Sequence, residues 1–205
     1  MYRKFGKRLM DIVLSGIVLI PLSLVYLILA VAIKVDDPGP VFFRQKRVGI
    51  HKTHFEIMKF RTMKMEPPRD MPTHLLKNPE QYITRVGGFL RKYSLDELPQ
   101  ILQIFTGEMS IVGPRPALWN QFDLSEERDK YGANDVRPGL TGWAQINGRD
   151  ELPIDVKARL DGEYVEKMGF FFDLKCMIGT LLPVFTGAGV VEGGTGSLEK
   201  ENKDT

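Results

Sequence analysis

The feature that most constrains this chain is an uncharged, apolar run from Ile12 to Ile33, close to the N-terminus. As a helix with a rise of about 1.5 Å per residue, it would be roughly 33 Å long, enough for a bilayer core of roughly 30 Å. Basic residues flank it on both sides: Arg3, Lys4, Lys7 and Arg8, then Lys34, Arg44, Lys46 and Arg47. Because basic flanks stay on the cytoplasmic side, both ends of the run are drawn to the same face of the membrane.

A proline in the middle of the run suggests how both ends reach one side. Pro21 removes a backbone donor and clashes with the preceding turn, and the Ser23 hydroxyl can bond a freed carbonyl. We therefore expect a re-entrant membrane anchor over residues 1–35, folded as helix-break-helix. Two alternatives remain open. Ala30-Val31-Ala32 matches the cleavage site of a signal peptide, and a straight spanning anchor tolerates proline.

The remainder of the chain is long enough for one globular domain. About 170 of the 205 residues follow the anchor, which is sufficient for a proper core. We place this domain at residues 36–190, and a flexible tail rich in Gly, Ser, Glu and Lys at 191–205. The single cysteine, Cys176, excludes an internal disulfide and suits a reducing compartment.

The net charge of +2 hides an uneven distribution. Residues 1–64 carry a net +8 and the remainder a net −6. Basic residues beside a membrane anchor attract anionic headgroups, which makes inner-membrane lipids expected partners. Neither a nucleic-acid motif nor a domain-wide basic excess is present, so we expect no nucleic-acid partner.

The pattern of residues after the anchor predicts an α+β fold, mostly helical with a short β-hairpin. Strands are expected at Val41–Val48 and Phe55–Met63, with Lys59 and Arg61 on one face because alternate side chains point the same way. Helices are expected at Gln81–Arg91, near Ser94–Phe105, in part of Leu118–Tyr131, at Pro153–Met168 and at Asp173–Phe185.

The sequence Ser94-Leu95-Asp96-Glu97 supports two interpretations. It fits a capping box, in which Ser94 and Glu97 satisfy the first amides of a helix. However, Pro99 makes this helix start irregular. An ionised Asp96 could instead attack phosphorus, and the adjacent carboxylates of Asp96 and Glu97 could hold Mg²⁺, which binds proteins through one or two carboxylates.

Two further segments are candidates for binding anions or polar ligands. Arg115 lies between Pro114 and Pro116, so it loses less conformational freedom when it binds an oxyanion. The alternative is a rigid turn with a solvated arginine. The segment from Arg137 to Arg149 contains three glycines, Trp143, Gln145 and Asn147, and it predicts a cradle for a polar ligand. The alternative is a surface loop with a buried tryptophan.

Several of these motifs, in this order and spacing, resemble the bacterial sugar transferases, that is, the monotopic phosphoglycosyl transferases. They are the basic start with Asp11, Lys59-Phe60-Arg61-Thr62-Met63, Ser94 to Gln100, Val112 to Pro116, and Arg137 to Arg149. The resemblance covers about residues 1–190. It implies transfer of a sugar phosphate, often of an N-acetylated sugar, from a UDP-sugar to undecaprenyl phosphate at the cytoplasmic face of the bacterial membrane. UMP is released, and assembly of a polysaccharide or glycoconjugate begins.

The resemblance also implies roles for individual residues. Asp96 matches the nucleophile and Mg²⁺ ligand, and Glu97 its partner. Basic residues match positions near the substrate phosphates: Arg91, Arg115, Arg149 and Lys59, to which we add Arg61 and Arg137 as candidates. The family usually breaks its membrane helix at Ser-Pro, whereas Leu24 follows Ser23 here, so the position of the bend stays open.

Three questions remain open from the sequence. Asp96 could form a covalent phosphosugar, or it could only hold metal in a single displacement. The chain could also bind lipid phosphate or nucleotide without turnover, although a pure anion binder gains nothing from two carboxylates beside its arginines. The oligomeric state is undetermined, with a homodimer as one candidate.

Overall fold

The computed structural model describes residues 2–65, 79–148 and 152–186, which combine helices with two small sheets. The helices are α1 (Lys7–Asp36, after a π-helical turn at Tyr2–Gly6), α2 (Arg85–Lys92), α3 (Gln100–Thr106), α4 (Phe122–Asp129), α5 (Trp143–Ile146), α6 (Ile154–Lys167) and α7 (Phe170–Thr186). The strands are β1 (Phe42–Val48), β2 (His54–Phe60), β3 (Ser110–Val112) and β4 (Gly139–Thr141). Short 3-10 turns lie at Ile50–Lys52, Pro79–Tyr82 and Leu95–Glu97, the last of which we call η5.

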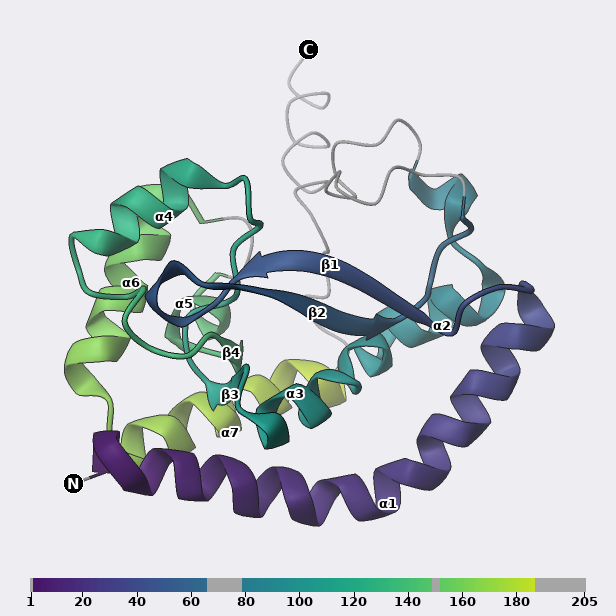
Figure 1. Cartoon of the computed structure of the whole chain (residues 1–205), viewed down its shortest axis with the longest axis horizontal. Coiled ribbons are helices and arrows are strands. Elements are labelled where there is room, and N and C mark those ends of the chain that lie inside the picture. The colour runs from purple at the N-terminus through teal and green to yellow at the C-terminus, as the bar shows by residue number, and fades with distance from the viewer. Residues whose placement is uncertain (1, 66–78, 149–151, 187–205) are drawn as a thin grey trace.

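Helix α1 is continuous, so the expected break of the helix at Pro21 is not observed. Pro21 lies inside the helix, whose two halves run in different directions in Figure 1. Proline removes only one backbone donor, and neighbouring helical bonds can hold the turn. Ser23 does bond a carbonyl as predicted, that of Ile20 at 2.7 Å. Helix α1 is therefore a single bent helix.

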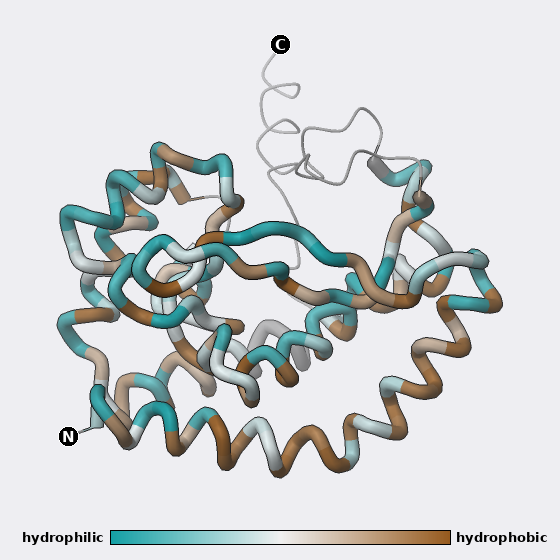
Figure 2. The backbone as a smooth tube through the Cα atoms, in the orientation of Figure 1, coloured by the Kyte–Doolittle hydropathy of each residue, from teal (hydrophilic) through white to brown (hydrophobic). Residues whose placement is uncertain are grey.

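The surface of α1 is apolar and largely exposed. The helix is long and apolar enough to cross a membrane, and Figure 2 shows hydrophobic residues along most of its length. Ile17, Ile20, Leu24 and Leu27 are all more than 60% exposed. Such a continuous apolar face requires lipid or a partner to cover it.

Both ends of α1 are attached to the globular domain. Near its N-terminus, the buried Asp11 carboxylate accepts hydrogen bonds from Ser110 Oγ (2.8 Å) and the Ile111 amide (3.0 Å). At its C-terminus, Ile33 is buried in a cluster with Phe60 and Leu90. The helix thus passes beneath the domain from the α7 side to the α2 side (Figure 1).

The predicted hairpin is confirmed, with small changes at its ends. Strands β1 and β2 pair antiparallel from Phe42 opposite Phe60 to Val48 opposite His54. Ile57 on β2 packs in a cluster with Ile104 and Met109, which fixes one face of the hairpin against α3. This packing brings the end of β2 close to η5.

A second, parallel pair of short strands joins two of the sequence motifs. Strand β3 pairs with β4, with Ser110 opposite Gly139 and Val112 opposite Thr141. Glycine is required at this crossing because a Cβ on Gly139 or Gly142 would lie 2.1 Å from a backbone atom of Gly113. Gly139 and Gly142, which were predicted to let a ligand approach the backbone, instead allow β4 and the residue after it to pack closely against the backbone at Gly113.

Candidate functional site

The Asp96 and Glu97 carboxylates are carried by a tight turn between α2 and α3. Ser94 has a left-handed backbone (φ 54°) and its side chain makes no capping bond, so the capping-box interpretation is wrong. The chain instead forms the 3-10 turn η5, and α3 begins only after Pro99, which has no amide to donate to an earlier turn. The turn leaves both carboxylates outside the regular part of α3.

Two cations from distant parts of the chain meet the Glu97 carboxylate. Lys59 Nζ, at the end of β2, lies 2.8 Å from Glu97 Oε1 and 3.7 Å from Asp96 Oδ2. Arg115 Nη2 lies 3.3 Å from the same Glu97 oxygen. The Asp96 residue is buried, with 3% of its surface exposed. The predicted cluster of Asp96, Glu97, Lys59 and Arg115 is thus brought together by the fold.

This arrangement keeps Glu97 negatively charged. Burial by itself raises the pKa of Glu97, but the charges of Lys59 and Arg115, with their hydrogen bonds, outweigh it and lower the pKa to about 2. A carboxylate that stays ionised at neutral pH cannot donate a proton. Glu97 is suited instead to holding cations in place.

Arg91 approaches the same region from α2, which packs against η5. Arg91 Nε donates to Thr62 Oγ1 at 2.9 Å, and this bond restricts the orientation of the guanidinium. Thr62 belongs to the Lys59-Phe60-Arg61-Thr62-Met63 motif, and its pairing with Arg91 is not predictable from their spacing in the sequence. The motif therefore supplies both a cation and a residue that orients a second cation.

Two of the predicted arginines lie elsewhere. Arg61 is buried and forms an ion pair with Asp37 just after α1, with a second bond to the Asp37 carbonyl. It lies beyond the end of β2, so the expected face shared with Lys59 does not extend to it. Arg137 donates to the Gly107 carbonyl at 2.9 Å, at the opposite end of α3 from η5. Arg149 falls outside the described residues.

The polar side chains of the predicted ligand cradle, residues 137–149, form hydrogen bonds with other groups of the protein. Trp143 packs beside Phe172, and its Nε1 donates to Glu163 at 2.9 Å. Gln145 Nε2 donates to the Leu140 carbonyl, and Asn147 Nδ2 to the Trp143 carbonyl. The alternative, a surface loop with a buried tryptophan, is met only in part, because Trp143 is half-buried against Phe172 and the segment forms β4 and α5.

The described residues include one candidate donor set for a divalent cation. No group of three or more His, Cys, Asp and Glu side chains gathers in the described part of the chain. Asp96 and Glu97 supply adjacent carboxylates, the hard oxygen ligands that Mg²⁺ takes singly or in pairs, with water and phosphate oxygens completing its shell. The donor chemistry therefore fits Mg²⁺ together with a phosphate substrate.

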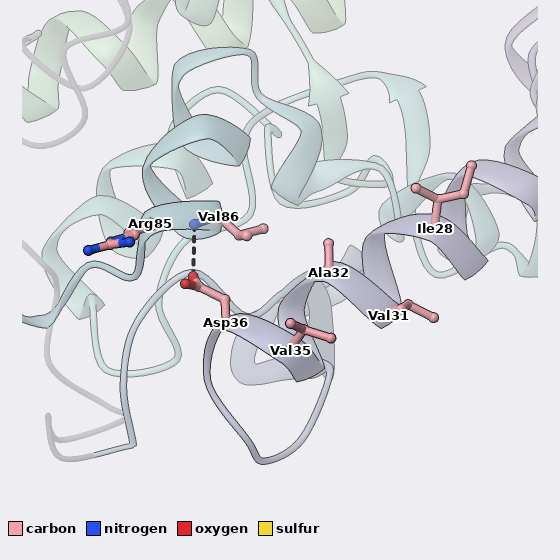
Figure 3. A pocket seen from close by; sticks show the side chains of 7 residues that line it. All are labelled: Ile28, Val31, Ala32, Val35, Asp36, Arg85 and Val86. Atoms are coloured by element: carbon pink, nitrogen blue, oxygen red, sulfur yellow. Dashed lines mark hydrogen bonds between the residues drawn. The ribbon is translucent and has the colours of Figure 1, made fainter.

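An open pocket lies apart from this cluster, between the end of α1 and the start of α2 (Figure 3). Its walls are mostly apolar, and the Asp36 carboxylate at its end accepts a bond from the Val86 amide at 2.8 Å. This bond ties the C-terminus of α1 to the N-terminus of α2. Neither Asp96 nor Glu97 lines the pocket.

Comparison with known proteins identifies the family. The model of the bacterial sugar transferase family matches residues 2–187. The chain belongs to the bacterial sugar transferase family. An uncharacterized sugar transferase of Bacillus subtilis, EpsL, is 40% identical over 90% of this chain and 89% of its own length.

Two further relatives of this sugar transferase have more specific names. The UDP-glucose:undecaprenyl-phosphate glucose-1-phosphate transferase of Escherichia coli is 40% identical over 88% of this chain. The UDP-N-acetylgalactosamine-undecaprenyl-phosphate N-acetylgalactosaminephosphotransferase of Aeromonas hydrophila is 36% identical over 90% of it. The matches cover only 40% and 45% of these two longer proteins. This sugar transferase is therefore an enzyme of the sugar phosphotransferase class.

Proposed function

We propose that this sugar transferase moves a sugar 1-phosphate from a UDP-sugar to undecaprenyl phosphate and releases UMP, as the first membrane step of polysaccharide or glycoconjugate assembly. One observation carries the proposal. The carboxylates of Asp96 and Glu97 lie among Lys59, Arg115 and the α2 helix that bears Arg91, on a domain attached to an exposed apolar helix. The site thus combines a nucleophile, phosphate-binding cations and access to lipid.

The attachments of α1 support a monotopic topology at the cytoplasmic face of the bacterial membrane. Asp11 and Ile33, near its two ends, are both buried against the same domain. A folded domain cannot lie on both sides of a bilayer, so a helix held to it at both ends enters the lipid and returns. Basic flanks at both ends place that side in the cytoplasm, where inner-membrane lipids surround the exposed residues between them.

The topology has a direct test in cysteine labelling. Cys176 is buried, so single cysteines introduced at Phe5 and Val35, which are 72% and 80% exposed, give the readable signals. Both Phe5→Cys and Val35→Cys should react with a membrane-impermeant maleimide in inside-out vesicles, and neither should react in intact spheroplasts. Labelling of the two positions from opposite sides would refute the re-entrant arrangement.

The proposed reaction has two displacements at one phosphorus atom. An Asp96 carboxylate oxygen attacks the sugar-bearing phosphorus, the bond to the bridging oxygen breaks, and UMP leaves with that oxygen and its electron pair. A phosphate oxygen of undecaprenyl phosphate then attacks the same phosphorus, and the Asp96 carboxylate leaves. Lys59, Arg91 and Arg115 are placed to offset the charge on the phosphate oxygens.

We propose Asp96 and Glu97 as the residues that would hold Mg²⁺ in this sugar transferase. The bound ion would supply neutralisation of the diphosphate charge. Glu97 is suited to this role because it stays ionised and holds Lys59 and Arg115 beside Asp96. Chelation by EDTA should stop UMP release, and added Mg²⁺ should restore it. UMP release that persists in EDTA would refute the metal requirement.

Mass spectrometry of the intact protein tests the covalent step. After incubation with UDP-sugar and Mg²⁺ but no lipid acceptor, wild type should gain the mass of one sugar phosphate, whereas Asp96→Asn should not. The family resemblance implies an N-acetylated donor, while the relatives are named for glucose and for N-acetylgalactosamine. The same incubation should therefore be repeated with each of a panel of UDP-sugars to identify the donor. UMP release only when undecaprenyl phosphate is present, with no added mass, would indicate a single displacement.

A further inference from the structure

We propose that the buried ion pair of Arg128 and Asp161 positions Arg115 for phosphate binding, although neither residue faces the substrate. The inference rests on the proposed function, in which Arg115 binds a substrate phosphate. Arg128 Nη2 donates to the Arg115 carbonyl oxygen at 3.0 Å. The side chain of Arg115 in turn reaches Glu97. Arg128 thus acts on the backbone from which the substrate-facing guanidinium extends.

The segment that carries Arg115 is held at every carbonyl from 114 to 117. The donors are, in order, the Gly139 amide (2.8 Å), Arg128 Nη2 (3.0 Å), Arg47 Nη1 (3.1 Å) and the Val48 amide (2.9 Å). The two outer bonds come from backbone amides, and the two inner ones come from arginine side chains. Because the flanking prolines fix their own φ angles, these four bonds leave the backbone at Arg115 little freedom. The direction of its side chain is therefore set before any ligand arrives.

Arg128 can hold this carbonyl because Asp161 holds Arg128. Arg128 Nε and Nη2 lie 2.8 and 2.6 Å from Asp161 Oδ2, and the two side chains are only 5% and 2% exposed. A guanidinium is planar with donors in a fixed fork, so a bond to Asp161 from one edge determines where Nη2 points. The pair joins α4 to α6 and presents one donor to the Arg115 carbonyl.

Stability alone does not account for an ion pair at this position. Helices α4 and α6 already share an apolar cluster that contains Leu124 and Ala158, together with Val48 and Ala117. Apolar residues of similar volume often replace a buried ion pair with no loss of stability, or with a gain. An apolar pair, however, could not donate to the Arg115 carbonyl. The charged pair supplies that donor.

The test is a double-mutant cycle on the full-length protein in detergent. The measured quantity is kcat/KM for UMP release from UDP-glucose or UDP-N-acetylgalactosamine, whichever wild type turns over. Arg128→Lys keeps the charge but loses the fork, and we expect it to lower kcat/KM by about 10- to 100-fold. In an Arg115→Ala background the same substitution should have no further effect. Lys130→Gln, which removes an exposed ion pair on the same part of the chain, is the control and should leave kcat/KM unchanged.

Hydrogen exchange gives a second readout that does not depend on turnover. In Arg128→Lys and Asp161→Asn, the peptide covering residues 111–119 should exchange faster than in wild type, while peptides from the β1–β2 hairpin should not. Unchanged exchange in 111–119 would overturn the inference. So would an equal loss of kcat/KM with and without Arg115, because that indicates a general structural defect. A wild type that releases no UMP with any donor would refute the proposed function, and the exchange result would still decide the inference.

Discussion

Replacing Glu97 with glutamine should destabilise the protein, since it removes a charge that contacts both Lys59 and Arg115. The pKa of Glu97 is lowered from 4.5 to about 2, which corresponds to about 3 kcal/mol of stabilisation at neutral pH. Removal of one partner from a fully buried ion pair typically costs about 3–5 kcal/mol, and the pairs of Glu97 are part-buried, so a value at the lower end of this range is expected. We therefore expect Glu97→Gln to lower the free energy of unfolding at pH 7 by about 3 kcal/mol.

The pH dependence of this difference is the sharper part of the prediction. The folded pKa of Glu97 lies below its ordinary value, so its contribution is complete above about pH 4.5 and is lost as the pH falls towards 2. The stabilities of wild type and Glu97→Gln should differ by a constant amount from pH 7 to about pH 5 and then converge. Urea unfolding in a fixed detergent, followed by the fluorescence of the two tryptophans, measures both curves.

The matched control is Glu127→Gln. Glu127 pairs with Lys130 on the surface of the molecule, so its replacement should change stability little at any pH. Two results would refute the reasoning. One is a Glu97→Gln variant as stable as wild type at pH 7, and the other is a stability difference that stays constant down to pH 2.

Four further substitutions, in η5, at Arg115 and near the two ends of α1, should change activity or stability. Asp96→Asn should reduce UMP release by at least about 1,000-fold with little change in melting temperature, measured by a coupled UMP assay and by thermal unfolding. Arg115→Ala should lower kcat/KM by about 10- to 100-fold, since under the proposed function it removes one charged hydrogen bond to the substrate phosphates, and an unchanged value in steady-state kinetics would refute that role. Asp11→Ala leaves the Ser110 hydroxyl and the Ile111 amide without the Asp11 carboxylate as acceptor, so it should lower the melting temperature in detergent. Asp37→Ala, at the other end of α1, removes the ion-pair partner of Arg61 and should lower the melting temperature independently of Asp11→Ala.

The secondary structure was largely predictable where hydrophobic periodicity is strong. The hairpin was expected at Val41–Val48 and Phe55–Met63, and it is observed at Phe42–Val48 and His54–Phe60. The last two helices were likewise expected close to their observed ranges. The start of α2 differs from the predicted start at Gln81. Helix α2 begins at Arg85 because the Thr84 side chain caps the Gly87 amide at 2.9 Å, a Thr N-cap that the sequence already contained.

The candidate site was predictable in its charges but not in their pairing. Lys59, Asp96, Glu97 and Arg115 belong to three separate motifs of the sequence, and the fold brings them together. Arg61 stands only two residues from Lys59, yet it pairs with Asp37. An arginine in a motif can bind substrate or stabilise the fold through an ion pair. Sequence spacing does not distinguish these two roles, because the tertiary structure determines which acidic group lies beside the arginine.

The pairing of Arg61 also explains how the long apolar helix α1 and the carboxylate-bearing turn η5 can move as one unit. Asp37, which accepts from Arg61, directly follows α1, and Lys59, two residues before Arg61, donates to Glu97 in η5. The end of α1 and the carboxylates of η5 are therefore joined through three consecutive residues, 59–61, at and just after the end of β2. Tyr26 adds a second connection, since its hydroxyl donates to the Leu98 carbonyl at 2.6 Å, one residue after Glu97. Any shift of α1 in depth would move η5 with it, so the position of the helix in the lipid would determine how far the carboxylates lie from a lipid phosphate.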